Sequence, residues 1–262
     1  MAMLSLAASA CTDSPQNESA QGDRAGNTAR GAPSAMQSTD RTGAAATSRT
    51  PPAAVPPAAN ATPGRARVVL LGTSLTAGLG LDPERAYPTL LQRKADSAGF
   101  RVDIVNAGLS GETSAGALRR ASWVLDQPAA AVVLEVGAND GLRGVNPDST
   151  YANLIALIAE IRRSQPGAKV LLVQMEAPTN LGRDYTTRFR QAYARVAREA
   201  GVPLLPFLLE GVAGVPRLNQ GDGIHPNAEG SRLVANTMWD ALRDIFAELD
   251  TGLALDSSSP PS

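Results

Sequence analysis

Short apolar runs alternate with longer amphipathic segments through the middle of the chain. The short runs are rich in Val, Leu and Ile, and they fall at 67–71, 101–105, 131–136, 169–174 and 202–205. The longer segments repeat apolar residues at helical spacing, and they fall at 86–98, 115–125, 149–164, 184–200 and 228–249. This alternation predicts strand–helix units around a parallel sheet. We therefore expect an α/β fold over residues 66–249, a flavodoxin-like three-layer α/β/α sandwich with a five-stranded parallel sheet.

The two ends of the chain lack this pattern. Residues 12–65 consist mainly of Ala, Pro, Ser, Thr, Gly and Asn, so they cannot bury enough apolar surface to offset the entropy lost on ordering. We expect a disordered linker there and a second disordered segment at 250–262. As a flexible coil of about 55 residues, the linker would span on the order of 40 Å.

The first eleven residues, MAMLSLAASAC, end in small residues followed by the only cysteine of the chain. This arrangement resembles a bacterial lipoprotein signal, although no Lys or Arg precedes the apolar stretch. It predicts an exported protein, periplasmic or anchored to a membrane through a lipidated Cys11. The alternative is an ordinary N-terminus in which Cys11 has no role. Labelling cells with palmitate and comparing the wild type with Cys11→Ala distinguishes the two.

The composition argues against several classes of protein. With 24 Lys and Arg against 25 Asp and Glu, the net charge is −1, which gives no electrostatic basis for nucleic-acid binding. One cysteine and one histidine are too few for a structural zinc site. The segment after Gly72 lacks the glycines of a dinucleotide loop and the lysine of a P-loop. We expect a monomer without metal or cofactor, whose partner is a small substrate.

Polar residues gather where the predicted strands end, which is the edge at which open parallel sheets bind ligands. Ser74 follows the first strand, Gly108 the second and Asn139 the third. Beyond the fifth strand lie Asp222 and His225. Each cluster alone could be a simple turn, but their joint occurrence at successive strand ends favours an active site.

Ser74, Asp222 and His225 have the chemistry of a catalytic triad. A serine hydroxyl is a weak nucleophile until a base takes its proton, and His225 is the only histidine of the chain. Asp222 lies three residues earlier, close enough to bind the imidazole and fix its tautomer. The sequence therefore predicts acyl transfer through an acyl-enzyme on Ser74, with activity lost at acid pH as the imidazole protonates.

Acyl transfer also needs donors for the oxyanion of the tetrahedral intermediate. The candidates are the backbone N–H groups of Ser74 and Gly108 and the side-chain amide of Asn139. Losing one such donor commonly costs about 3 to 4 kcal/mol of transition-state stabilisation. Of the remaining charged residues, we expect Glu135 to be a partnered polar residue inside a strand, and Arg119 and Arg120 to lie on a solvated helix face.

The four clusters together resemble the sequence blocks of the GDSL/SGNH hydrolase family, whose name gives its Ser, Gly, Asn and His. Over residues 67–249, the stretches NAGLSGETS, GANDGLRG and GDGIHPN are similar to the exported bacterial thioesterase, arylesterase and lysophospholipase branch. The first block reads GTSL, with Thr73 where the family has Asp. In the family that Asp is not a triad member, so the departure concerns the local turn.

The resemblance implies a serine esterase for carboxylic esters, which include aryl and acyl esters, lysophospholipids and acyl thioesters. By the same similarity, Leu109 and Leu142 are expected to flank the acyl chain. One alternative within the family is an O-acetyl esterase or acyltransferase acting on a surface polysaccharide. An alternative of another class is a non-catalytic lipoprotein that binds lipid or glycan. Hydrolysis abolished by Ser74→Ala would exclude the non-catalytic alternative.

Overall fold

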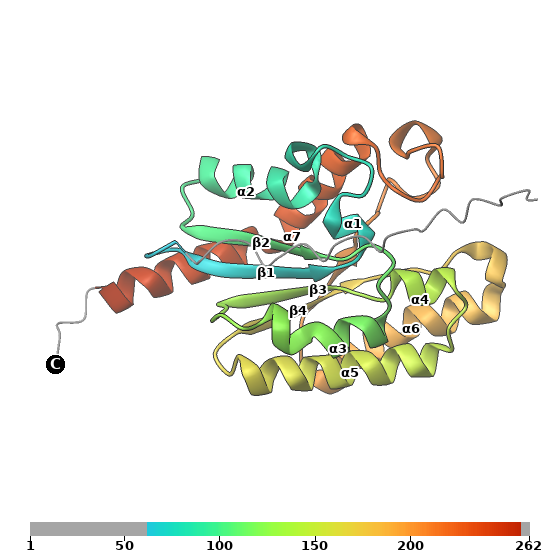
Figure 1. Cartoon of the computed structure of the whole chain (residues 1–262), viewed down its shortest axis with the longest axis horizontal. Coiled ribbons are helices and arrows are strands. Elements are labelled where there is room, and N and C mark those ends of the chain that lie inside the picture. Colours follow the sequence, from blue (N-terminus) through green and yellow to red (C-terminus); the bar gives the residue numbers. More distant parts are fainter. Residues whose placement is uncertain (1–61, 258–262) are drawn as a thin grey trace, which may run out of the picture. The chain divides into compact units, whose positions relative to one another are not determined.

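The computed structural model describes residues 62–257 (Figure 1). Its strands form one parallel sheet and are β1 (Ala66–Gly72), β2 (Val102–Gly108), β3 (Ala131–Glu135), β4 (Lys169–Gln174) and β5 (Leu204–Phe207). Their order across the sheet is β2-β1-β3-β4-β5, the flavodoxin-like order. The predicted five-stranded parallel sheet is confirmed. The expected signal with Cys11, and the linker up to residue 61, lie outside the described residues.

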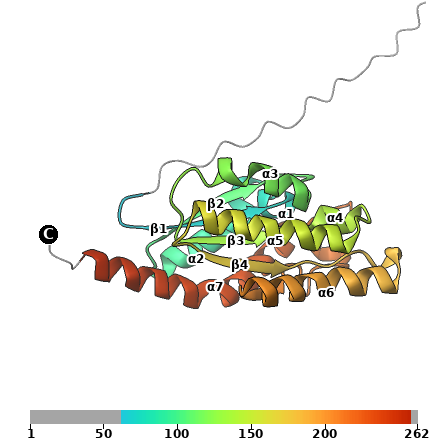
Figure 2. The same ribbon diagram turned by 90° about the horizontal axis from the view of Figure 1, so that it is seen from below.

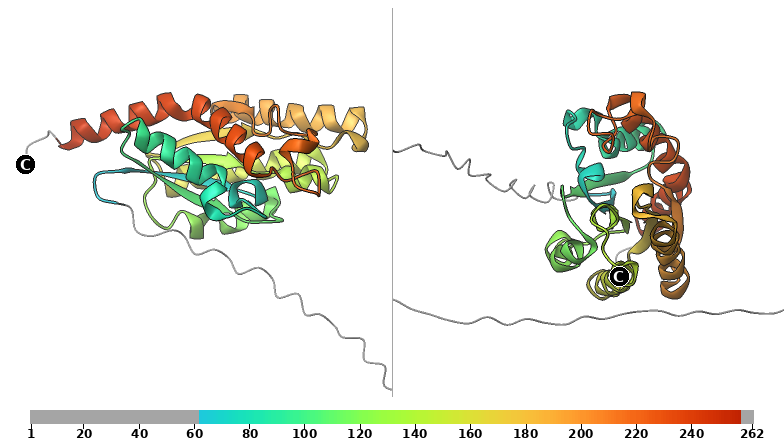
Figure 3. Two further views of the ribbon diagram at one scale, coloured as in Figure 1. Left: turned by 90° about the horizontal axis from the view of Figure 1, so that it is seen from above. Right: turned by 90° about the vertical axis from the view of Figure 1, so that its right-hand side faces the viewer.

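Helices cover both faces of the sheet. They are α1 (Ser74–Ala77), α2 (Tyr87–Ser97), α3 (Ser114–Val124), α4 (Ala138–Leu142), α5 (Pro147–Ser164), α6 (Arg183–Ala200) and α7 (Ala228–Ser257). Short 3-10 turns occur at Pro83–Arg85, Thr179–Leu181 and Pro216–Leu218. Helix α5 packs between α3 and α6 on one face (Figure 2), and α2 packs against α7 on the other (Figure 3). The expected three layers are therefore present.

The position of each strand in the sheet explains its sequence. Every residue of β1 and β3 is buried, because these strands lie inside the sheet with helices on both faces. Such strands are continuous apolar runs rather than alternating ones. The edge strands β2 and β5 contain partly exposed positions. Among the described residues, no helix is both long and apolar enough to cross a membrane.

The ordered domain is longer at both ends than the sequence indicates. Helix α7 continues to Ser257 instead of ending near Leu249, and just past the predicted end the Asp250 carboxylate accepts hydrogen bonds from the backbone and the guanidinium of Arg101. Arg65, expected in the linker, forms ion pairs of 2.5 Å with Asp96 and Asp103. Both additions are tied to the domain by side-chain contacts far apart in sequence, which periodicity alone does not predict.

Candidate active site

The segment after β1 turns sharply to present Ser74. Strand β1 ends at Gly72, Thr73 is the N-cap, and Ser74 is the first residue of α1. A Cβ on residue 72 would lie 2.0 Å from Thr76 Oγ1 and 2.7 Å from Glu135 Oε2. Only glycine fits there. Because Ser74 opens α1, its backbone N–H has no acceptor within the helix.

The structure brings the three predicted triad residues together. His225 Nε2 lies 2.9 Å from Ser74 Oγ, and His225 Nδ1 lies 2.6 Å from Asp222 Oδ2. The ring is therefore in hydrogen-bond contact with both partners, although Ser74 and His225 are 151 residues apart in sequence. This is the geometry in which an imidazole can take a proton from a serine hydroxyl.

Asp222 fixes the tautomer of His225. Its Oδ1 accepts the backbone N–H groups of Ile224 at 2.9 Å and His225 at 3.0 Å. The hydrogen bond from the His225 ring, together with these two backbone donors, lowers the pKa of Asp222 to about 2. An ionised carboxylate only accepts, so Nδ1 carries the proton and Nε2 is left to accept from Ser74.

The loop that carries His225 is closed on itself and tied to the loop after α1. Gln220 N donates to His225 O at 2.7 Å, and Gln220 Nε2 donates to Leu79 O at 2.7 Å and Pro226 O at 3.0 Å. Gly223 has a φ of +70°, a backbone conformation that L side chains rarely adopt. These contacts hold His225 against the segment that carries Ser74.

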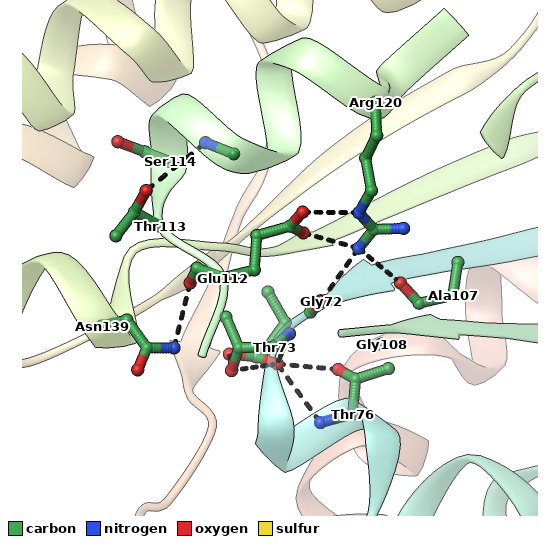
Figure 4. A network of polar contacts seen from close by, with 12 residues as sticks. Gly72, Thr73, Thr76, Ala107, Gly108, Glu112, Thr113, Ser114, Arg120 and Asn139 are labelled. Atoms are coloured by element: carbon green, nitrogen blue, oxygen red, sulfur yellow. Dashed lines mark hydrogen bonds and ion pairs between the residues drawn. The ribbon is translucent and has the colours of Figure 1, made fainter. Parts of the chain in front are cut away.

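The expected oxyanion donors lie on the neighbouring elements. Asn139 is in α4, and its side-chain amide donates to Glu112 O at 2.9 Å, which leaves its second N–H for another acceptor (Figure 4). Gly108 ends β2, and its N–H donates to Asn106 Oδ1 at 3.0 Å. A Cβ on residue 108 would lie 2.2 Å from Ala77 N, so glycine is needed for α1 to pack here.

Glu135, expected to be a partnered polar residue, lies beneath the Ser74 turn. Its carboxylate accepts the backbone N–H of Thr73 at 2.8 Å and that of Thr76 at 3.3 Å, and both threonine hydroxyls donate to it as well. Burial raises the pKa of Glu135 to about 7 despite these donors. The two threonines were not recognised from sequence; their places immediately before and two residues after Ser74 were the available signal.

The prediction for Arg120 was wrong. Arg119 is exposed, but the Arg120 side chain is only 16% exposed and makes two hydrogen bonds of 2.6 Å to the Glu112 carboxylate (Figure 4). Helix α3 buries Ala117, Ala121 and Val124. Arg120 lies three residues after the first of these and four before the last, so it shares their face. This spacing was the signal that could have identified it.

An apolar groove of about 480 Å³ opens beside Ser74. Most of the residues around it are apolar, and they include Leu75, Leu142, Met175, Pro178, Phe207, Leu209 and Ile224. Leu142 and Ile224 are exposed at this groove, whereas Leu109 is not among its lining residues. Within residues 62–257, no group of three His, Cys, Asp or Glu side chains is placed to hold a metal ion.

The chain is similar to several proteins that are named esterases. The chain is 38% identical to esterase TesA of Pseudomonas aeruginosa over 68% of this chain and 89% of that protein. It is 37% identical to thioesterase 1/protease 1/lysophospholipase L1 of Escherichia coli K12, over 68% and 84% of the two chains. The crystal structure of the psychrotrophic esterase EstA from Pseudoalteromonas sp. is similar with a TM-score of 0.66 and 33% identity, covering 69% of this chain and 98% of that one.

A family model also matches the chain directly. The GDSL-like lipase/acylhydrolase model covers residues 70–233, a span that begins in β1 and ends in α7. The match extends over more than half of the chain and includes every residue placed around Ser74 above. This protein is therefore a hydrolase of carboxylic esters that belongs to the GDSL-like lipase/acylhydrolase family.

Proposed function

We propose that this protein is a serine esterase in which Ser74 is the nucleophile, His225 the general base and Asp222 the group that orients His225. The observation that carries the proposal is the contact of 2.9 Å between His225 Nε2 and Ser74 Oγ. In the first step, Nε2 takes the hydroxyl proton as Oγ attacks the ester carbonyl carbon. Asp222 stays ionised and stabilises the imidazolium that forms.

The imidazolium then gives its proton to the leaving alcohol or thiol, and the acyl group remains on Ser74. Water enters next, transfers a proton to Nε2 and attacks the acyl carbon. The intermediate then expels Ser74 Oγ, which takes the proton back from Nε2 as the carboxylic acid leaves. Each tetrahedral intermediate carries an oxyanion. We assign its binding to the Ser74 N–H and the Asn139 amide, with a smaller part for the Gly108 N–H because that group is shared with Asn106.

The groove beside Ser74 supports a substrate with an apolar acyl chain. Apolar residues outnumber its polar side chains, which besides Ser74 and Asn139 are Glu176, Thr179 and Asn180; this composition favours an acyl chain over the sugar of a polysaccharide O-acetyl esterase or acyltransferase. Fatty acyl esters, lysophospholipids and acyl thioesters all present such a chain. Leu142 lines the groove from α4, the helix that also carries Asn139, and this supports an apolar chain that lies close to the reacting carbonyl.

The experiment measures hydrolysis of p-nitrophenyl esters from acetate to palmitate by the full chain. We expect the highest kcat/KM for medium or long acyl chains. Ser74→Ala and His225→Ala should each lower kcat by at least about 10⁴-fold while the thermal unfolding midpoint stays close to that of the wild type. Hydrolysis retained by Ser74→Ala would overturn the proposal, and no hydrolysis by the folded wild type would favour the non-catalytic binding protein.

Leu142 tests the substrate class. Leu142→Asn should lower kcat/KM for a long-chain ester about 10-fold or more, because burying the apolar chain would no longer be favourable there, and it should change acetate hydrolysis little. Leu204→Asn is the matched control, since Leu204 is also exposed but does not line the groove. Equal loss on acetate and on long chains would argue against an acyl-chain role for Leu142.

A further inference from the structure

Arg120 reaches from α3 to the carboxyl ends of two neighbouring strands (Figure 4). Its guanidinium donates to the carbonyl oxygen of Gly72, the last residue of β1, at 3.3 Å and to that of Ala107 in β2 at 2.8 Å. The same group holds the Glu112 carboxylate in a two-pronged contact. A planar guanidinium fixes several acceptors relative to one another, which a lysine ammonium does not.

The backbone carbonyls of Gly72, Ala107 and Glu112 each lie close to one of the proposed oxyanion donors. Ala107 directly precedes Gly108, and Gly72 precedes Ser74 by two residues. The backbone carbonyl of Glu112 accepts the Asn139 amide at 2.9 Å. The Arg120–Glu112 pair therefore contacts the polypeptide beside all three donors, which come from three different elements of the fold.

We propose that Arg120 and Glu112 are positioning residues that set the placement of the three oxyanion donors relative to one another. The inference rests on the proposed function, because it presumes an oxyanion at Ser74. Neither side chain touches the reacting atoms. Arg120 acts through the backbone of Gly72 and Ala107, and Glu112 acts through its own carbonyl on Asn139.

The physical reason is the narrow tolerance of an oxyanion site. One N–H of the Asn139 amide is held by Glu112 O, and this contact decides where the other N–H points. The donors act only if they lie close to the position that the oxyanion will occupy. A displacement of about 1 Å commonly costs on the order of 100-fold in rate. Substrate binding depends on the groove and should be affected much less.

The experiment compares Glu112→Gln and Arg120→Lys with the wild-type full chain on one p-nitrophenyl ester. We expect kcat to fall about 10- to 100-fold in both variants with KM within about threefold of the wild type. Arg119→Lys is the matched control, since Arg119 is exposed on the same helix, and it should keep wild-type kcat. Wild-type kcat in folded Glu112→Gln and Arg120→Lys would overturn the proposal.

A double-mutant cycle with Asn139→Ala separates positioning from a general loss of structure. If Glu112 acts through the Asn139 amide, Glu112→Gln should lower kcat by less than about threefold in the Asn139→Ala background. Equal factors in both backgrounds would overturn the inference. If Glu112→Gln fails to fold, the same cycle is made with Glu112→Asp, which keeps the negative charge but shortens the side chain that reaches Arg120.

The same kinetic measurements distinguish a wrong positioning role from a wrong assignment of the nucleophile. If Ser74→Ala is inactive while Glu112→Gln and Arg120→Lys keep wild-type kcat, only the positioning role is wrong. If Ser74→Ala retains hydrolysis, the assignment of the nucleophile is wrong and the oxyanion argument falls with it.

Discussion

Two carboxylates lie near Ser74, Asp222 beyond His225 and Glu135 at the turn between β1 and α1, and they differ in exposure and in pKa. Asp222 is 44% exposed in its side chain, contacts His225, and its pKa is lowered to about 2 by the hydrogen bonds it accepts. Glu135 is 1% exposed, lies under the turn that carries Ser74, and its pKa is raised to about 7 by burial. The same functional group is thus kept charged at one position and near the point of protonation at the other.

The comparison shows that the number of hydrogen bonds does not decide the charge of a carboxyl group. Glu135 accepts from two backbone N–H groups and two hydroxyls, whereas Asp222 accepts from two backbone N–H groups and one ring. Loss of water around Glu135 outweighs its extra donors. Solvent contact at Asp222 lets its donors act without that penalty, which suits a group that must stay ionised beside an imidazolium.

The largest expected effect comes from removing the exposed charge. Asp222→Asn keeps the size of the side chain but lets it donate to Nδ1, which favours the wrong tautomer of His225. We expect kcat to fall about 10⁴-fold. The thermal unfolding midpoint should change little because Asp222 is substantially exposed. Steady-state kinetics and thermal unfolding of the same preparation test both parts, and a loss of activity that follows a loss of folding would contradict the assignment.

The second prediction concerns the buried carboxyl group of Glu135, whose titration should change the free energy of unfolding with pH. Glu135 has an ordinary pKa of 4.5 in the unfolded chain and about 7 in the fold, so the folded state holds its proton more tightly. Its contribution to the free energy of unfolding is therefore full below pH 4.5 and is lost as the pH rises through about 7. The shift corresponds to about 3 kcal/mol.

Glu135→Gln removes this titration while keeping the shape of the side chain. Urea unfolding of the wild type and the variant is measured at about pH 5 and about pH 8. Relative to the variant, the wild type should lose about 2.5 kcal/mol of unfolding free energy at the higher pH, because part of the contribution is already lost at pH 5. Asp250→Asn is the control, since the hydrogen bonds from Arg101 lower the pKa of Asp250 below its ordinary value of 3.8, outside this range. Parallel stability curves for Glu135→Gln and the wild type would show that Glu135 does not titrate near neutrality.

Sequence and structure agree best where a residue acts beside its own strand end. Gly108 ends its strand, and Ser74 and Asn139 lie shortly after theirs; parallel strands bring such ends to one edge. Their positions were therefore predictable before any coordinates. The fold class was predictable for the same reason, because every residue of β1 is buried between helices and the strand stands out as a continuous apolar run.

Apolar runs and strand ends do not predict contacts that depend on the direction of a side chain. The sequence shows Glu135 inside a strand but not that Thr73 and Thr76 donate to it, because the turn between β1 and α1 sets their direction. Thr73 stands where the family has Asp, and its hydroxyl faces the Glu135 carboxylate. Glu112 lies in a loop without periodicity, so nothing in the sequence linked it to Arg120 or Asn139.

The smallest predicted effect tests the far end of the buried network. The Tyr87 hydroxyl lies 2.8 Å from Thr76 Oγ1, which donates to Glu135, so Tyr87 supports the charged carboxylate through one intervening hydroxyl. Tyr87→Phe should lower the free energy of unfolding by about 1 kcal/mol, and by a few tenths more at about pH 8 than at about pH 5.

Tyr193→Phe is the matched control for this change. Tyr193 is equally buried, but its hydroxyl donates at 2.8 Å to the backbone carbonyl of Val136 rather than into the Glu135 network. We expect Tyr193→Phe to lower the free energy of unfolding by a similar amount, about 1 kcal/mol, that is the same at both pH values. Urea unfolding measures both variants. If Tyr87→Phe were as independent of pH as Tyr193→Phe, the hydroxyl of Tyr87 would contribute to packing and hydrogen bonding but not to the charge of Glu135, and the buried carboxylate would depend on its threonine donors alone.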